Sequence, residues 1–236
     1  MKRTILFSVL TMLAGSVYGH DMFVDFGVGG GYSSTDLKFH NPNSTNYQAP
    51  TTKSGSYLSL ANKDDSDNDL VSSVTVGYKY DDLNTVMKAS YHDFGEVEAR
   101  GSATFPDGTY EQKLTSSSSA AFVGMGTIFN VSPSVYLEAT GNVGVSFIDS
   151  SGTQGENLGG SNRFPNESNT NLAWGVGAGV GYNLFSDLDL MFNVNYFSLG
   201  EADTGTTAGG GGMNADERLE SELSFTTATI SVRQLF

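Results

Sequence analysis

Six charged residues occupy positions where ionic chemistry is expected. They lie in segments in which apolar and polar residues alternate, and each stands on the polar side of that alternation. The six are Asp25, Lys79, Lys88, Glu138, Asp189 and Arg233. Because their charges are balanced, two hypotheses follow: a paired network that fills the interior of a folded domain, or a narrow path for ions that opens when the pairs rearrange.

Histidine is the usual base of a serine hydrolase, and the chain has 3 of them. His20 and His40 lie outside the alternating segments. Only His92 stands at the end of one, with Asp93 and Glu96 near enough in sequence to orient it. Phe94 occupies the position of the serine in a His-x-Ser pair. We therefore expect no catalytic residue and expect His92 at the rim of the domain.

An acidic segment, 64–69, has the spacing of a calcium loop. Asp65, Asp67 and Asp69 alternate as its first ligands do, but Leu70 replaces the required glycine. The bidentate glutamate at the end of such a loop is also missing. We expect a solvated acidic loop, with a loose divalent-cation site as the alternative.

Gly-x-Gly spacing occurs within 27–31 and 175–181, and such spacing can mark a nucleotide-binding loop. Both glycine runs lie inside alternating segments rather than before a helix, so that context is missing. No cofactor is expected, and the glycines are expected to make space for large neighbours.

The elements that must position these residues are strands. Alternation with a period of two recurs in segments of about 10 to 14 residues, the length that a tilted strand needs to cross a bilayer. We predict eight strands: 22–33, 70–80, 85–94, 120–129, 135–147, 172–182, 188–198 and 221–236. Apolar side chains are expected to face outward and polar or small ones inward.

The connections alternate between short and long. Turns are expected at 81–84, 130–134 and 185–187, and long polar connections at 34–69, 95–119, 149–170 and 200–220. Backbone groups in hydrocarbon need internal partners, so crossing strands must close on themselves. The sequence therefore predicts an all-β fold: an eight-stranded antiparallel transmembrane β-barrel with short periplasmic turns and four long extracellular loops.

The N-terminus has the features of an export signal. A basic start is followed by the apolar segment 4–14 and by small residues up to Gly19, so we expect a signal peptide at 1–19 and the barrel domain at 20–236. The absence of cysteine rules out a lipid anchor on Cys and disulfides. A net charge of -14 argues against a nucleic-acid partner.

The last strand places Ile230, Val232 and the terminal Phe236 on one face, which resembles the signal read by the outer-membrane assembly machinery. Gln234 stands where an apolar residue is usual. Upstream, 91–98 and 196–203 share a Tyr-x-x-apolar-Gly-Glu-x-acid pattern at predicted strand ends.

With these features the chain resembles the OmpA-type, opacity-protein-like family of small outer-membrane barrels, without the peptidoglycan-binding domain of two-domain OmpA proteins. The resemblance implies an outer-membrane protein in contact with lipid and lipopolysaccharide. It also implies a non-enzymatic structural, adhesion or surface-antigen role, carried by acidic loops that meet host or cell-surface ligands. The alternatives are a small porin-like channel and, less favoured, a lipid A-modifying enzyme.

Overall fold

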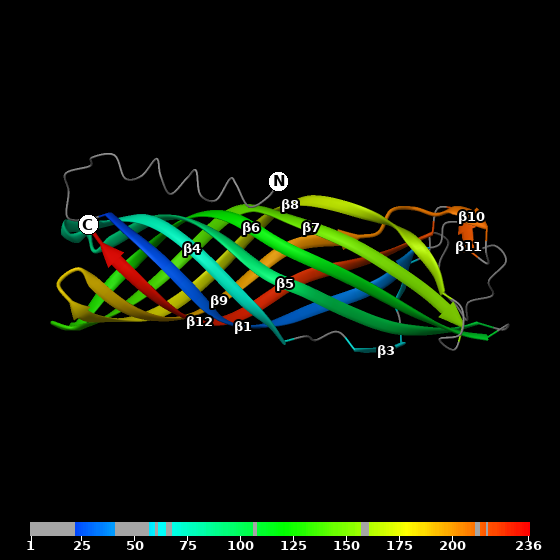
Figure 1. Cartoon of the computed structure of the whole chain (residues 1–236), viewed down its shortest axis with the longest axis horizontal. Coiled ribbons are helices and arrows are strands. Elements are labelled where there is room, and N and C mark those ends of the chain that lie inside the picture. Colours follow the sequence, from blue (N-terminus) through cyan, green and yellow to red (C-terminus); the bar gives the residue numbers. More distant parts are fainter. Residues whose placement is uncertain are drawn as a thin grey trace.

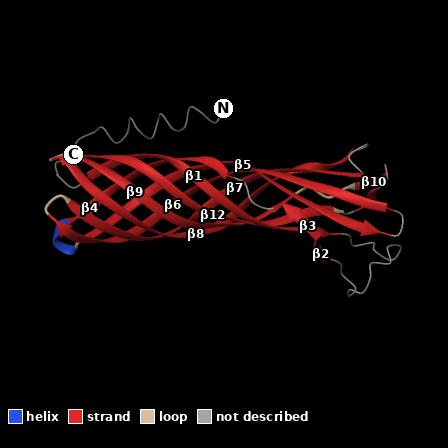
Figure 2. Cartoon of the chain, turned by 90° about the horizontal axis from the view of Figure 1, so that it is seen from below, coloured by secondary structure: helices blue, strands red, loops and turns tan. Residues whose placement is uncertain are grey.

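Eight antiparallel strands form a closed ring (Figures 1 and 2). The computed structural model describes residues 22–40, 57–59, 61–64, 68–105, 108–156, 161–210, 213–215 and 217–236. In ring order the strands are β1 (Met22–His40), β4 (Asn68–Tyr80), β5 (Thr85–Phe105), β6 (Gly108–Ser132), β7 (Val135–Glu156), β8 (Ser161–Phe185), β9 (Leu188–Asp203) and β12 (Arg218–Leu235). The predicted eight-stranded barrel is confirmed. The predicted signal peptide at 1–19 lies outside the described residues.

Four short strands lie beyond the ring. β2 (Tyr57–Ser59) pairs with β1, and β3 (Ala61–Asp64) pairs with β5. β10 (Ala208–Gly210) and β11 (Met213–Ala215) pair with each other. Within the described ranges, no helix is long and apolar enough to cross a membrane.

The ring closes where its first and last strands meet. β1 and β12 form one ladder, in which Asp25 lies opposite Arg233, and the Phe236 amide donates a hydrogen bond of 2.9 Å to the Met22 carbonyl. A closed ring leaves the membrane-spanning strands without an edge, and an open edge in hydrocarbon would carry unpaired backbone groups.

One half of the barrel's length has an apolar outer face. Val28, Val143 and Val176 are all more than half exposed there. The Trp174 and Tyr196 rings, with centroids 5.6 Å apart, lie at one border of this face. Aromatic side chains at the border of an apolar band mark the membrane interface of such barrels.

Most of the long connections predicted for the other end are strand. β5 and β6 pair as far as Phe105 and Gly108, and β7 and β8 pair up to Gly155 and Ser161. The predicted strands were therefore too short at this end: β5 and β7 end later than predicted, and β6 and β8 begin earlier. Beyond the aromatic border the alternation continues with its sense reversed: Leu37 is buried inside while Lys38 points outward. Water outside makes the interior the only place to bury apolar side chains.

The two Gly-Glu repeats coincide with β-bulges. Gly95 and Gly200 have φ angles of 75° and 89°, which favour glycine, and the ladder register shifts beside each. The extra residues are Phe94 and Leu199, both fully buried. Each bulge exchanges the inward and outward positions of its strand, so that the outer face remains polar beyond the membrane.

A glycine pair provides a test of the packed interior. A Cβ on Gly181 would lie 2.2 Å from the Tyr136 ring, whereas one on Gly141, which faces outward, would have no atom within 4 Å. We expect Gly181→Ala to lower the free energy of unfolding by about 1 to 3 kcal/mol. Gly141→Ala should change it by less than about 0.5 kcal/mol. Urea titration of the refolded barrel, followed by a heat-sensitive gel shift, measures both, and equal losses would contradict this packing.

Candidate functional site

The predicted charges gather inside the half of the barrel with the apolar outer face. Arg233 Nη1 of β12 donates a hydrogen bond of 2.8 Å to Glu138 Oε2 of β7. Lys88 Nζ of β5 donates one of 3.2 Å to the other oxygen of Glu138. Asp25 of β1 lies 3.5 Å from Arg233 Nε. The side chains of Glu138 and Arg233 are 2% and 4% exposed, so each is an ion that depends on its partners.

Tyr136 connects the other two predicted residues to this group. Its hydroxyl donates a hydrogen bond of 2.7 Å to Asp189 Oδ2 and accepts one of 3.4 Å from Arg233. The Lys79 ammonium lies 5.9 Å from the centroid of the Tyr136 ring. Tyr136 was not among the expected network residues because it carries no charge, although its place in the alternation indicated that it faces inward.

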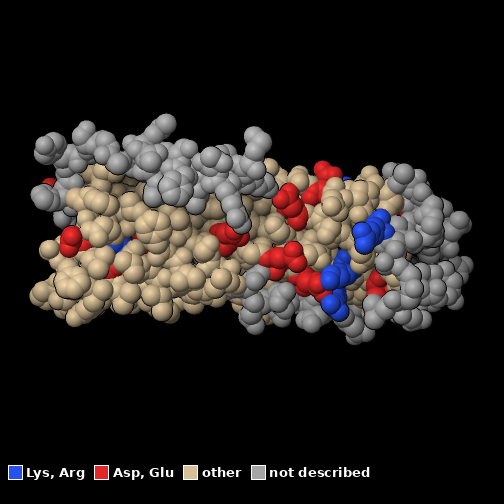
Figure 3. Space-filling view, viewed as in Figure 1, with Lys and Arg blue, Asp and Glu red and all other residues tan. Residues whose placement is uncertain are grey.

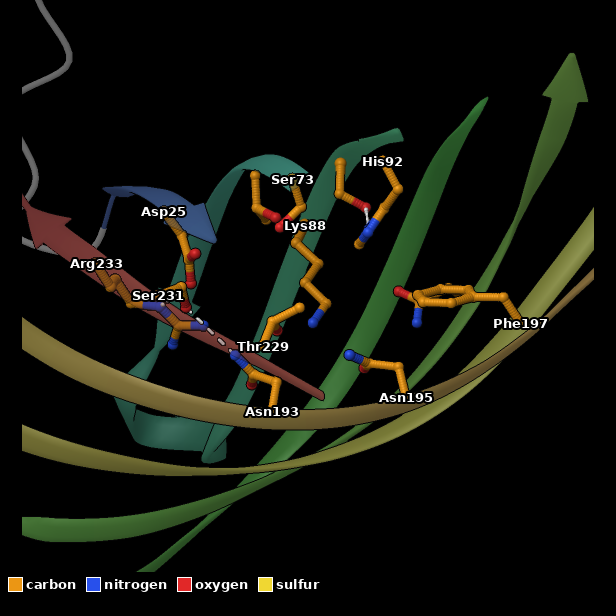
Figure 4. A pocket seen from close by; sticks show the side chains of 13 residues that line it. Asp25, Ser73, Lys88, His92, Asn193, Asn195, Phe197, Thr229, Ser231 and Arg233 are labelled. Carbon is orange, nitrogen blue, oxygen red and sulfur yellow. Dashed lines mark hydrogen bonds and ion pairs between the residues drawn. The ribbon is translucent and has the colours of Figure 1, made fainter. Parts of the chain in front are cut away.

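A small polar cavity of about 40 Å³ adjoins the network (Figure 4). Its lining includes Asp25, Lys88, Asn193, Asn195 and Ser231, and Asn193 donates a hydrogen bond of 3.3 Å to the Ser231 hydroxyl. The space suits a few water molecules rather than a continuous channel.

Apolar layers lie on both sides of the network and its cavity. Toward the short turns, a cluster holds the buried side chains of Phe23, Val86, Ile128, Tyr136 and Met191. Toward the long hairpins, Phe197 packs on Phe122 and Phe94, with ring centroids 5.1 Å and 5.3 Å away. In the same layer, the ring centroids of Phe225 and Phe94 lie 4.8 Å apart. The interior thus alternates between apolar and polar layers along its length.

The expectation that His92 lies at the rim was wrong. Its ring faces the cavity and lies 4.9 Å from that of Phe197, and its Nε2 is 3.1 Å from the Ser90 hydroxyl (Figure 4). Asp93 and Glu96 are exposed on the outer face, where neither can orient His92. Alternation places His92 inside the barrel, and the bulge at Gly95 keeps Glu96 outside.

The C-terminal residues are arranged as the alternation indicates. Ile230, Val232 and Phe236 are exposed on the outer face, and Gln234 donates a hydrogen bond of 3.2 Å to the Asp187 carboxylate in the neighbouring turn. A role of these residues in assembly stays a prediction. The side chains of the acidic segment 64–69 lie outside the described residues.

Charged side chains crowd the outer face of the other half of the barrel (Figure 3). Glu98 of β5 forms ion pairs with Lys113 and Arg100. Partial burial opposes ionisation of Glu98, but the hydrogen bonds from these two cations lower its pKa below the usual range. This part of the surface is therefore charged at neutral pH.

The comparisons agree with the ring of strands. A family model described as "Outer membrane protein beta-barrel domain" matches residues 5–233. The outer membrane protein OprG from Pseudomonas aeruginosa is 11% identical over 94% of this chain and 99% of its own, with a TM-score of 0.51. The outer membrane protease OmpT from Escherichia coli is 8% identical over 94% of this chain and 98% of its own, with a TM-score of 0.51. No curated protein matches. Such identities indicate a shared fold alone.

Proposed function

Because the chain belongs to the outer membrane protein β-barrel domain family, we propose that it is a non-enzymatic surface barrel whose extracellular hairpins make contacts outside the cell. The protein is located in the outer membrane. In this proposal the buried charges and apolar layers fill the lumen, and the role in adhesion, or as a surface antigen, belongs to the parts that project from the membrane.

The length of the hairpins carries the proposal. β6 and β8 have 25 residues each, whereas a tilted strand needs about 9 to 11 residues to cross a bilayer. The part beyond the membrane has its own buried apolar cluster, which includes Leu37, Leu114, Phe164 and Leu219. A packed extension of this kind holds the hairpin ends at a fixed distance from the membrane.

Trimming two hairpins tests the proposal. Residues 102–111 and 155–161 are each replaced by Asn-Gly, a pair that favours a tight turn between paired strands. We expect the trimmed barrel to fold, as judged by its heat-sensitive gel shift, while cells that display it attach to cultured epithelial cells no better than cells without the protein. If cells that display the trimmed barrel attach as well as cells that display the untrimmed one, the proposal is contradicted.

A small channel is the second candidate. The observation in its favour is that Glu138 binds both Lys88 and Arg233 beside a polar cavity, so that a change of partner would rearrange the interior. Bilayer recordings on the same folded preparations separate the two candidates. Silence favours the surface barrel, and steady conductance that changes in Glu138→Gln favours the channel.

A further inference from the structure

A row of cations crosses four neighbouring strands on the outside of the extracellular half. Arg100 of β5 lies opposite Lys113 of β6, which lies opposite Thr153 of β7, which in turn lies opposite Arg163 of β8. We call these four residues the flank row. Directly opposed residues share one face of a sheet, so the three cations point outward together.

The flank row stands out in a chain of net charge -14. Five Lys or Arg side chains are described on the outside of the extracellular half, namely Lys38, Arg100, Lys113, Arg163 and Arg218. Three of the five belong to the flank row. Figure 3 shows Lys and Arg gathered in that half of the molecule, beside acidic side chains.

A hollow opens along the flank row between β6, β7 and β8. Its volume is about 270 Å³, and the ladder between β7 and β8 is irregular beside it, between Ser150 and Gly152. Hydroxyl groups of Thr115, Ser151 and Thr153 line the hollow together with the Asn166 amide, and Lys113 and Arg163 lie at its sides. Hydroxyls and amides beside cations are groups that bind sugars and anionic substituents.

Arg163 is the cation with capacity for a ligand. Lys113 and Arg100 are paired with Glu98, whereas no described side chain pairs with the exposed Arg163 guanidinium. Glu111 is exposed two residues beyond Lys113, toward the hairpin end. A planar guanidinium offers two parallel N–H donors to phosphate. The Lys113 ammonium has three N–H donors, so its pair with Glu98 leaves donors for the same ligand.

The height of the flank row indicates the source of the ligand. Arg100 lies nine residues beyond Tyr91, an exposed aromatic near the membrane border, which corresponds to roughly 20 to 25 Å along the axis of a tilted barrel. The row faces sideways, so the saccharides of the surrounding outer leaflet reach it directly. A polymer arriving from another cell meets the hairpin ends first.

We propose that this hollow binds a phosphorylated saccharide of the lipopolysaccharide that surrounds the barrel. The inference rests on the proposed outer-membrane surface role and names one partner for it. Arg163 and Lys113 would bind the phosphate, and the hydroxyl and amide groups would bind the sugar.

Calorimetric titration of the refolded full-length barrel tests the proposal. The probe is phosphorylated core oligosaccharide, prepared from lipopolysaccharide by removal of its acyl chains. We expect Arg163→Ala to raise the dissociation constant roughly tenfold or more, because it loses a hydrogen bond to a charged group. Arg163→Lys should retain part of the affinity. Lys38→Ala removes an outward cation outside the flank row whose acidic partners, Asp36 and Glu222, are exposed, and should leave the dissociation constant within about twofold.

The proposal is contradicted if the folded barrel does not bind the phosphorylated probe, if it binds the probe equally well after the phosphates are removed, or if Arg163→Ala leaves binding unchanged. Preference for heparin over the probe would also overturn it, because the ligand would then be a sulfated polymer from outside. The trimmed hairpin variant retains the flank row, so loss of attachment and loss of saccharide binding can be told apart.

Discussion

Arg233→Met is expected to lower the free energy of unfolding by about 3 to 5 kcal/mol, the usual cost of removing one partner from a buried ion pair. Glu138 would keep only Lys88, and Asp25 would lose the cation that lies opposite it in the ladder. Methionine roughly preserves the volume above the Phe23 ring, on which the guanidinium stacks at 4.2 Å. Urea titration with the gel shift measures the loss.

Two controls separate charge from packing. Arg163→Met removes an exposed cation that no described side chain pairs with, and should cost less than about 0.5 kcal/mol. Adding Asp25→Asn to Arg233→Met removes the carboxylate that has lost its cation and should recover part of the stability, because an uncompensated buried charge causes much of the cost. If Arg233→Met is as stable as the parent, the network does not hold the lumen together.

The sequence predicted the membrane part of the fold well because one physical rule governs it. Hydrocarbon demands apolar outer faces and closed hydrogen bonding, so alternation of the type seen in 188–198 determines both the element and its orientation. The same alternation placed Glu138 and Arg233 inside. It could not give the pairing, because which of several inward charges meet depends on the register between strands that are distant in sequence.

The half of the barrel that carries the long hairpins was missed because its alternation has the opposite sense. Leu37 and Phe39 alternate with Asp36 and Lys38 as regularly as any membrane segment, but the apolar residues face inward. A search for apolar outer faces interprets such a segment as a loop. The signal was present in the period of two, and the change of sense at the membrane border follows from the change of solvent.

His92 shows what the alternation of inward and outward positions along a strand can and cannot predict. Counting from Lys88 places His92 inside, so its position was available from the sequence. Its surroundings were not, because Phe122 and Phe197 come from β6 and β9 and meet it only in the closed ring. The bulges added a second obstacle, since each reverses inward and outward positions for the rest of its strand.

Phe197→Ala is expected to lower the free energy of unfolding by about 3 to 5 kcal/mol, because it removes a ring at the centre of the apolar layer and leaves a cavity between Phe94 and Phe122. Phe192→Ala is the matched control on the same strand. Phe192 is 49% exposed on the lipid side, where acyl chains can fill the space that its ring leaves. It should therefore lose only the transfer free energy of the ring, about 1.5 to 3 kcal/mol.

The difference between the two variants measures packing inside the lumen. The same urea titration with the gel shift applies to both, since the substitution and the strand are shared. A loss in Phe197→Ala that exceeds the loss in Phe192→Ala by about 1 to 2 kcal/mol would identify the layer as a close-packed core. Equal losses would mean that the layer is loosely filled. A loosely filled layer could open without a large cost, and the channel would then become the better account of the lumen.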